Sequence, residues 1–313
     1  MNRLSQTLTL LLGVQLLLAI FVFWPADNQS EDGAGATLLS VNADSIDRLS
    51  ISDSDTALLL QRQDANWIMP EYHNLPVDAA KIARTLNDLP RLPRGWPVAS
   101  SDGAATRFEV AEDNFQRRVE YFEGDSSKGA LFVGTSPGFR KVHTRVGGES
   151  PVYAVEYNSF DLPAQPAEWL DKTLLQVGDI QFVSGLDYEL SLEGESWNDA
   201  EGNTADAASV EALVNGLASL RVTSVADIAT AAILDEMNAP PTITVTTTED
   251  VYEYRLFEME EAYYVQRADI PVFFNLSGFD HNRLNEVNAE SLFPVESGEN
   301  VEGKIGGNDG SES

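Results

Sequence analysis

The chain has 313 residues, of which 20 are Lys or Arg and 50 are Asp or Glu, and its formal net charge is −30. The absence of cysteine excludes disulfides, thiolate nucleophiles and cysteine-ligated zinc or iron–sulfur sites. The negative charge argues against nucleic acid and anionic lipid as partners, because their phosphates would repel the chain. A hydrophobic fraction of 43% supports a folded core, and the length is typical of about two domains.

Residues 1–25 predict a membrane anchor. The stretch from Thr7 to Trp24 has eighteen residues without a charge, and a helix of that length spans roughly 27 Å, close to the thickness of a bilayer's hydrocarbon core. Arg3 precedes the stretch and acidic residues follow it, so we expect a cytoplasmic N-terminus and an extracytoplasmic bulk. The alternative is a signal peptide cleaved after Ala36. We favour a retained single-pass anchor, because the small residues at 34–36 lie well past the apolar run.

Polar segments flank the part of the chain that we expect to fold. Residues 26–39 predict a flexible linker, and residues 294–313 predict a disordered acidic tail. Both are poor in the large apolar side chains that a core requires.

Between these segments the same order of features occurs twice. Two alternating segments that end in a tryptophan, Trp67 or Trp197, are followed by a loop and the sequence Asp-Ala-Ala. Each aspartate, Asp78 or Asp206, lies where a helix N-cap is favoured, and apolar residues follow it at helical spacing. We expect each tryptophan at the end of the second strand of its unit.

The correspondence continues towards the end of each copy. Residues 108–123 and 243–258 alternate, so each range predicts a hairpin. Residues 140–161 then align with residues 262–280. The alignment pairs Arg145 with Arg267 and Phe160-Asp161 with Phe279-Asp280.

These observations predict an α+β fold made of two tandem repeats, residues 40–175 and 176–293, after an N-terminal transmembrane helix. Each repeat is expected to be an antiparallel sheet with one amphipathic helix lying across it. The charge is divided unevenly, since residues 46–175 carry a net charge of −5 and residues 176–293 a net charge of −18. Solubility in a salty medium explains this difference simply; selection or repulsion of a charged partner is the alternative.

An ordered set of short motifs points to a family. The motifs are Pro-Val-Asp-Ala-Ala at 76–80, Val-His-Thr-Arg-Val at 142–146 and Glu-Trp-Leu-Asp-Lys-Thr-Leu-Leu at 168–175. With them the chain resembles the domain of unknown function 4340 family over most of residues 40–290, although the second unit has no match to 168–175. The resemblance implies a bacterial protein with one membrane span, an extracytoplasmic repeat region and genes for gliding-motility-type ABC transporter components beside its own. It implies no catalytic residues.

Residues 134–138 fit the G-x-S-x-G pattern of a serine hydrolase, in which Ser136 would be the nucleophile. That chemistry needs a strand-to-helix turn, but the residues that follow alternate, so we predict a hairpin turn instead. His143 would then lie some 20 Å along the hairpin arm, at roughly 3.3 Å per residue.

The sequence predicts no metal or cofactor. His73, His143 and His281 are too far apart for a local metal motif. The acidic stretches at 53–55 and 198–203 lack the ligand order of a calcium loop and are interpreted as turns.

One local basic cluster stands out in this acidic chain. Arg84, Arg91 and Arg94, with Trp96 close by, either mark a solvated helix end or form a docking patch for an acidic partner.

We therefore expect a membrane-anchored, extracytoplasmic accessory or scaffold protein without catalysis, which serves an ABC-type transporter or an envelope assembly of the bacterial inner membrane. One alternative is a glycan- or peptide-binding module, whose aromatic candidates are Tyr252, Tyr254, Tyr263 and Tyr264. The other is a serine hydrolase that uses Ser136.

Overall fold

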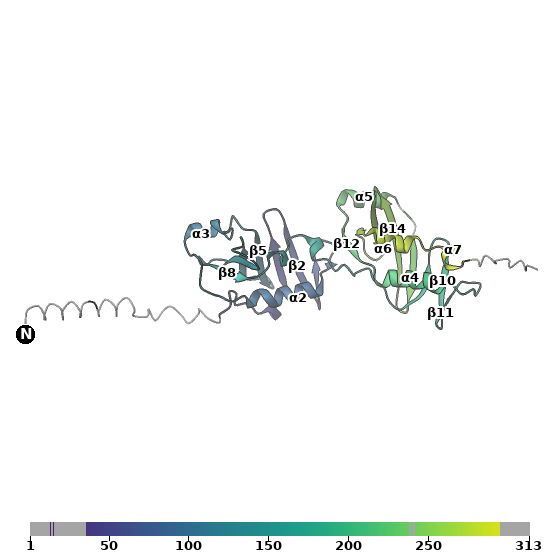
Figure 1. Ribbon diagram of the computed structural model, residues 1–313, viewed down its shortest axis with the longest axis horizontal. Coiled ribbons are helices and arrows are strands. Elements are labelled where there is room, and N and C mark those ends of the chain that lie inside the picture. The colour runs from purple at the N-terminus through teal and green to yellow at the C-terminus, as the bar shows by residue number, and fades with distance from the viewer. Residues whose placement is uncertain (1–12, 14, 16–35, 238, 240–241, 295–313) are drawn as a thin grey trace, which may run out of the picture. The chain divides into compact units, whose positions relative to one another are not determined.

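The computed structural model describes Gly13, Gln15 and residues 36–237, 239 and 242–294 (Figure 1). The rest of the predicted anchor at Thr7–Trp24 and nearly all of the predicted tail lie outside the described residues. In the described part, no helix has the length and apolar character that crossing a bilayer requires. The chain divides into two compact units, the first ending at Trp169 and the second beginning at Leu170.

Over its described residues, the first unit forms one antiparallel sheet of eight strands in the order β4-β3-β2-β1-β5-β6-β7-β8. The strands are β1 (Arg48–Ser52), β2 (Ala57–Gln63), β3 (Asn66–Met69), β4 (Leu75–Pro76), β5 (Arg117–Glu123), β6 (Ser126–Val133), β7 (Lys141–Val146) and β8 (Val152–Glu156). Helix α2 (Ala79–Asp88) buries Ile82 and Leu86. The second helix of the unit is the short α3 (Asp102–Arg107).

In the second unit the described residues form another antiparallel eight-stranded sheet, in the order β11-β10-β9-β13-β14-β15-β16-β12. Its strands are β9 (Ile180–Ser184), β10 (Glu189–Glu193), β11 (Ser196–Asn198), β12 (Val222–Val225), β13 (Ile243–Thr247), β14 (Val251–Met259), β15 (Ala262–Arg267) and β16 (Phe274–Leu276). Its helices are α4 (Ala207–Ala218), α5 (Ile228–Glu236), α6 (Gly278–Asn285) and α7 (Ala289–Leu292). The α+β class with antiparallel sheets is therefore confirmed.

The two sheets share their strand order, because β3-β2-β1-β5-β6-β7-β8 of the first matches β11-β10-β9-β13-β14-β15-β16 of the second. Trp67 and Trp197 occupy equivalent positions, as predicted, but each is the second residue of the third strand rather than the end of the second strand. The reason is a tight turn before each tryptophan, in which Asp64 or Gly194 adopts a positive φ and closes the hairpin early.

The predicted helix caps are confirmed. A carboxylate oxygen of Asp78 accepts from the Lys81 backbone N–H at 2.9 Å, and one of Asp206 accepts from that of Ser209 at 2.8 Å. The backbone N–H groups of the same aspartates bond to buried residues near the end of each unit. Asp78 N–H donates to Trp169 O at 2.8 Å, and Asp206 N–H donates to Leu292 O at 2.7 Å. The second unit thus has a positional counterpart of Trp169, although its sequence there does not match.

Two expectations about these elements are wrong. Residues 108–123 do not form the expected two-stranded hairpin, since β5 pairs with β1 and β6 and the residues before it contribute only an isolated antiparallel bridge between Val110 and Phe115. Residues 108–116 instead pack on the sheet, with Val110 buried beside Phe132. Residues 243–258 do form the hairpin of β13 and β14.

One amphipathic helix for each sheet is also too few. A cluster that includes Ala104 of α3 packs on Phe132, which points to the opposite face from its strand neighbours Leu131 and Val133. In the second unit, Leu234 of α5 packs with Phe257 of β14. Each sheet is therefore covered by a short second helix, which precedes β5 in the first unit and β13 in the second.

The last strand of each repeat does not lie uncovered at the sheet edge. Val98 N–H donates to Val152 O at 2.8 Å, and Val152 N–H donates to Ala99 O at 2.8 Å, so residues 98–99 pair with the first residue of β8 in an isolated bridge. In the second unit β12 pairs with β16 at the corresponding edge.

Candidate functional site

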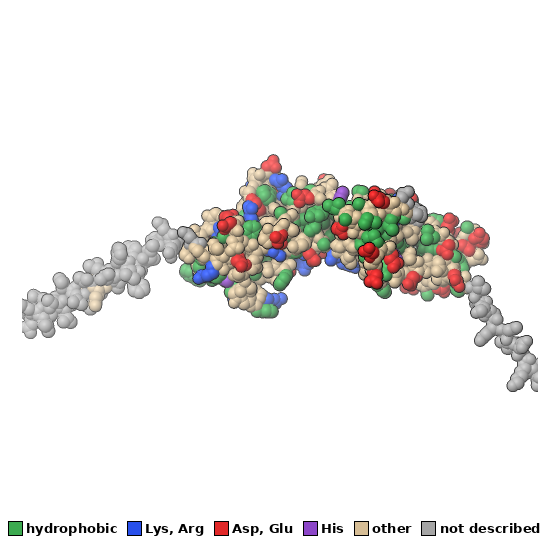
Figure 2. Space-filling view, turned by 90° about the horizontal axis from the view of Figure 1, so that it is seen from above, with side chains coloured by type: hydrophobic (Ala, Val, Ile, Leu, Met, Phe, Trp, Pro, Cys, Tyr) green, Lys and Arg blue, Asp and Glu red, His purple; other side chains and the backbone are tan. Residues whose placement is uncertain are grey.

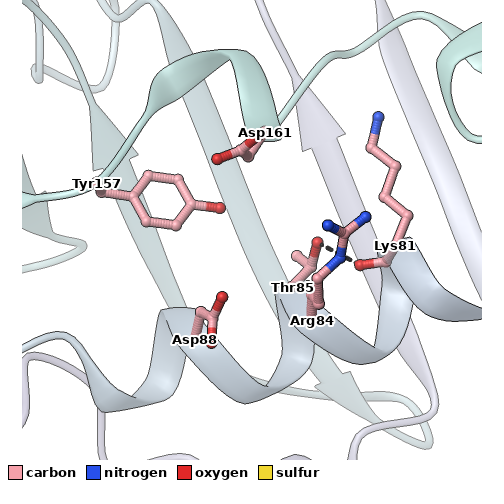
Figure 3. A pocket seen from close by; sticks show the side chains of 6 residues that line it. All are labelled: Lys81, Arg84, Thr85, Asp88, Tyr157 and Asp161. Carbon is pink, nitrogen blue, oxygen red and sulfur yellow. Dashed lines mark hydrogen bonds between the residues drawn. The ribbon is translucent and has the colours of Figure 1, made fainter. Parts of the chain in front are cut away.

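The first unit contains a cleft of about 280 Å³ between α2 and the segment that follows β8 (Figure 3). Residues that recur at helical spacing project from α2 into this cleft, while the residues below them on the same helix pack on the sheet. The lining residues are Lys81, Arg84, Thr85 and Asp88 of α2, with Tyr157 and Asp161 opposite.

Two cations lie at one end of the cleft. Lys81 Nζ donates to Glu168 O at 2.8 Å and lies 4.7 Å from the centroid of the Trp169 ring. The exposed Arg84 donates through Nε to Ala80 O at 3.3 Å. Within the part of the chain that the structure describes, the guanidinium of Arg84 makes no ion pair.

Two carboxylates and a tyrosine lie at the other end. In Figure 3 the Tyr157 ring reaches across the cleft, and its hydroxyl points towards the space between Asp161 and Asp88. Burial raises the pKa of Tyr157 well above its usual value, and the charges of Asp161 and Asp88 raise it further. The Tyr157 hydroxyl is therefore a neutral donor at physiological pH, and among the described residues it has no hydrogen-bond partner.

In the second unit, helix α6 fills the corresponding space. Asn158 and Ser277 each cap a helical turn that contains Phe-Asp, but the first unit's turn stops at Asp161, where Leu162 precedes a proline. The second unit's turn continues as α6, which lies against α4. There a Cβ added to Gly216 would lie 2.9 Å from Leu284 Cδ2, so this glycine permits the close packing.

The residues of the predicted basic cluster do not form one patch, because each lies in a different environment. Arg84 lines the cleft, and Arg91 is exposed at the end of the short helix Leu89–Arg91. Arg94 is half-buried, where it pairs with Glu149 and donates through Nε to the Tyr153 hydroxyl at 3.0 Å. Trp96 is 83% exposed.

The G-x-S-x-G segment connects two strands, β6 and β7, as predicted. Ser136 Oγ lies 2.7 Å from the carbonyl oxygens of both Gly138 and Lys141, which share its single hydroxyl hydrogen. The expected position of His143 far along the arm is wrong, because its N–H donates to Thr135 O at 2.8 Å and its Nδ1 lies 2.9 Å from Thr135 Oγ1. The arm is short because the loop folds back directly after β6.

The remaining candidates take structural positions. His281 of α6 is buried and stacks on Tyr263, with ring centroids 4.5 Å apart, whereas His73 is exposed. Across the described residues there is no group of three or more His, Asp or Glu that could hold a metal ion. The side chains of Asp53 and Asp199 accept backbone N–H groups two to four residues ahead, which is the geometry of a turn.

The four candidate tyrosines do not form a solvent-facing row. Tyr254 is fully buried and its hydroxyl donates to Leu175 O at 2.7 Å. Tyr264 is buried in the cluster that α5 covers. Only Tyr252 and Tyr263 of the four are half-exposed.

Each unit also presents a large apolar side chain at the same place. Phe160 is 86% exposed and Phe279 is 73% exposed, and both stand one residue before the aspartate of the capped turn. Sequence alignment pairs these phenylalanines, but it does not reveal that both point to solvent.

One comparison with known proteins gave a match. The model of a family described as Domain of unknown function (DUF4340) matches residues 67–239, which span most of the first unit and the first half of the second. No curated protein and no solved structure matches the chain.

Proposed function

Since the chain belongs to the DUF4340 family, we propose that it is a membrane-anchored, extracytoplasmic accessory protein that serves an ABC-type transporter or another assembly of the bacterial inner membrane. Its two units are copies of one ancestral unit that follow a single N-terminal transmembrane helix. The proposal assigns no reaction to the chain.

The observation that carries this proposal is the repeated exposure of Phe160 and Phe279. A single exposed apolar residue is ordinary on a protein surface, but two copies of a unit with diverged surfaces have both kept one. Burial of a large apolar side chain under a partner protein contributes favourable free energy to binding, because it removes apolar surface from water. The two units therefore offer two similar contact points to a partner or to a pair of partners.

The docking role is tested by co-purification of the full chain from detergent-solubilised membranes. We expect the double variant Phe160→Ala, Phe279→Ala to retain its melting temperature. The amount of partner recovered with it should fall about tenfold or more relative to the parent chain, the usual effect of removing an aromatic contact. Phe139→Ala is the matched control, because Phe139 is 90% exposed in a loop of the first unit alone. Equal partner recovery from all three proteins would contradict the docking role.

The anchor is tested separately. The full chain should sediment with membranes and resist extraction by high salt, because apolar residues rather than charges hold it there. A mature N-terminus at Thr37 would instead establish cleavage after Ala36.

A further inference from the structure

The charges of the cleft in the first unit are arranged against the stability of their own helix. Lys81 lies in the first turn of α2 and Asp88 is its last residue. A helix macrodipole favours the reverse order, with anions near the N-terminus and cations near the C-terminus. Side chains that oppose local stability are expected where a function requires them.

The charges also stay apart within the cleft. Arg84 and Asp88 are four residues apart on α2, a spacing at which opposite charges meet on a helix surface. The described residues nevertheless include no ion pair between them, because the Arg84 guanidinium turns back towards Ala80 O. Figure 3 shows the Asp88 carboxylate directed towards Tyr157, at the other end of the cleft.

We propose that this cleft binds a small zwitterion, with the ligand's anionic group at Arg84 and its ammonium group between Asp88 and Asp161. Lys81 adds positive potential at the anionic end, where it remains bonded to Glu168 O. The Tyr157 hydroxyl lies between the two carboxylates and supplies a neutral hydrogen-bonding group beside the ammonium. A volume of about 280 Å³ suits an amino acid or a dipeptide.

The second unit supports a specialised role for these residues. Counted from the cap aspartates, the counterparts of Lys81, Arg84 and Asp88 are uncharged: Ser209, Ala212 and Gly216. In that unit α6 occupies the space, and Arg283 of α6 donates to Gly216 O at 3.2 Å. The three charges on the helix are thus found in the copy whose cleft is open and are missing from the copy whose cleft is filled, where of the charged lining only Asp161 keeps a charged counterpart, Asp280.

Two sources could supply this chemistry, amino acids or peptides on the one hand and ethanolamine phospholipid headgroups on the other. The probes are therefore glycylglycine and O-phosphoethanolamine, titrated by calorimetry into the full chain in detergent. Acetate and methylamine, which each carry one of the two charges, serve as half-ligands. We expect saturable binding of a zwitterion and at least about tenfold weaker binding of either half-ligand, since each contacts only one end.

Variants of the lining assign the binding to the cleft. Arg84→Gln and the pair Asp88→Asn, Asp161→Asn should each weaken zwitterion binding about tenfold or more without lowering the melting temperature. Arg91→Gln is the matched control, because Arg91 is exposed just beyond α2 and does not line the cleft. Tighter binding of glycylglycine assigns an amino acid or peptide, and tighter binding of O-phosphoethanolamine assigns a headgroup.

The inference is independent of the accessory role, since loss of partner docking leaves it unchanged. Absence of binding by both zwitterions would overturn it. Binding that is unchanged in the Arg84 and Asp88–Asp161 variants would overturn it as well.

Discussion

Gly134 lies where the backbone of another segment passes within contact distance. A Cβ at this position would lie 2.0 Å from the carbonyl oxygen of Phe108, which a side chain cannot occupy. Gly138, the other glycine of the same motif, has nothing within 4 Å of its own Cβ position. The first glycine of G-x-S-x-G is thus explained by packing.

The two glycines give a matched pair of variants. We expect Gly134→Ala to lower the free energy of unfolding by about 3 kcal/mol or more, because the backbone at 108–109 must move. Gly138→Ala should change it by less than about 0.5 kcal/mol. Urea unfolding of both variants measures the difference, and equal midpoints would contradict the close approach.

Ser136 is expected to be dispensable. Its single hydroxyl hydrogen is shared by the backbone carbonyls of Gly138 and Lys141, so Ser136→Ala should leave folding and partner recovery close to those of the parent chain. Serine-directed fluorophosphonate probes should not label the parent chain. Stoichiometric labelling that is lost in the alanine variant would support the hydrolase alternative instead.

His143 makes stability depend on pH. Burial lowers its pKa below the ordinary 6.5, and the charge of Arg107 lowers it further. The unfolded chain therefore binds the proton more readily, so the free energy of unfolding falls as the pH drops from about 6.5 through the folded-state pKa. Above about pH 6.5 this contribution is fully present.

Urea unfolding between pH 7.5 and pH 5 tests the histidine. His143→Asn should flatten this part of the pH dependence. His73→Asn is the control, since His73 is exposed with a φ of 53°, a conformation that asparagine tolerates. If the slope survives in His143→Asn, the titrating group lies elsewhere.

The cleft could be predicted from the sequence only in part. Although helical spacing also places Lys81 and Asp88 on the same side of the helix, Arg84 was a candidate only as a member of the basic cluster with Arg91 and Arg94. Tyr157 and Asp161 were not, because their position depends on how the end of β8 meets α2. No local pattern reports that arrangement.

At the scale of single elements, the N-cap residues of α2 and α4 also bond to the end of their own unit, because the N–H of each cap aspartate donates to the carbonyl of Trp169 or Leu292. Asp78→Ala should lower the free energy of unfolding by about 1 kcal/mol, because the Lys81 N–H loses its acceptor. Asp78→Asn keeps an accepting oxygen and should retain most of the stability. Chemical denaturation of the full chain compares the two, and an equal loss in both variants would show that the cap itself contributes little.

The strands and the two capped helices followed from alternation and helical spacing. The failure at 108–116 has a physical reason, since alternation reports burial of every second residue but not the presence of a pairing strand. Val110 is buried by packing against Phe132, and its pairing within this range is limited to an isolated bridge to Phe115. Helix α3 was missed because its six residues are too few to display a period, and α5 was missed because it buries only Leu234 and so shows no apolar face.

At the scale of the whole molecule, acidic side chains are frequent on the face of the second unit in Figure 2. Residues 176–293 have a net charge of −18, compared with −5 for residues 46–175. Added salt screens such repulsion, because the Debye length shortens to about 10 Å at 0.1 M. Raising the NaCl concentration should therefore stabilise the second unit more than the first. Hydrogen exchange with mass spectrometry resolves the units, and equal protection gains would contradict this expectation.

The covered edges of β8 and β16 have a consequence for how the chain is made. Neighbouring units with one topology are prone to exchange strands while they fold, and an unpaired edge is the usual point of entry. In each unit the segment that covers this edge precedes, in the chain, the strand that it protects. It is therefore synthesised first. When the last strand of the unit leaves the ribosome, the segment that pairs with it, from the same unit, is already present. This order gives the last strand of each unit less opportunity to pair with the other copy.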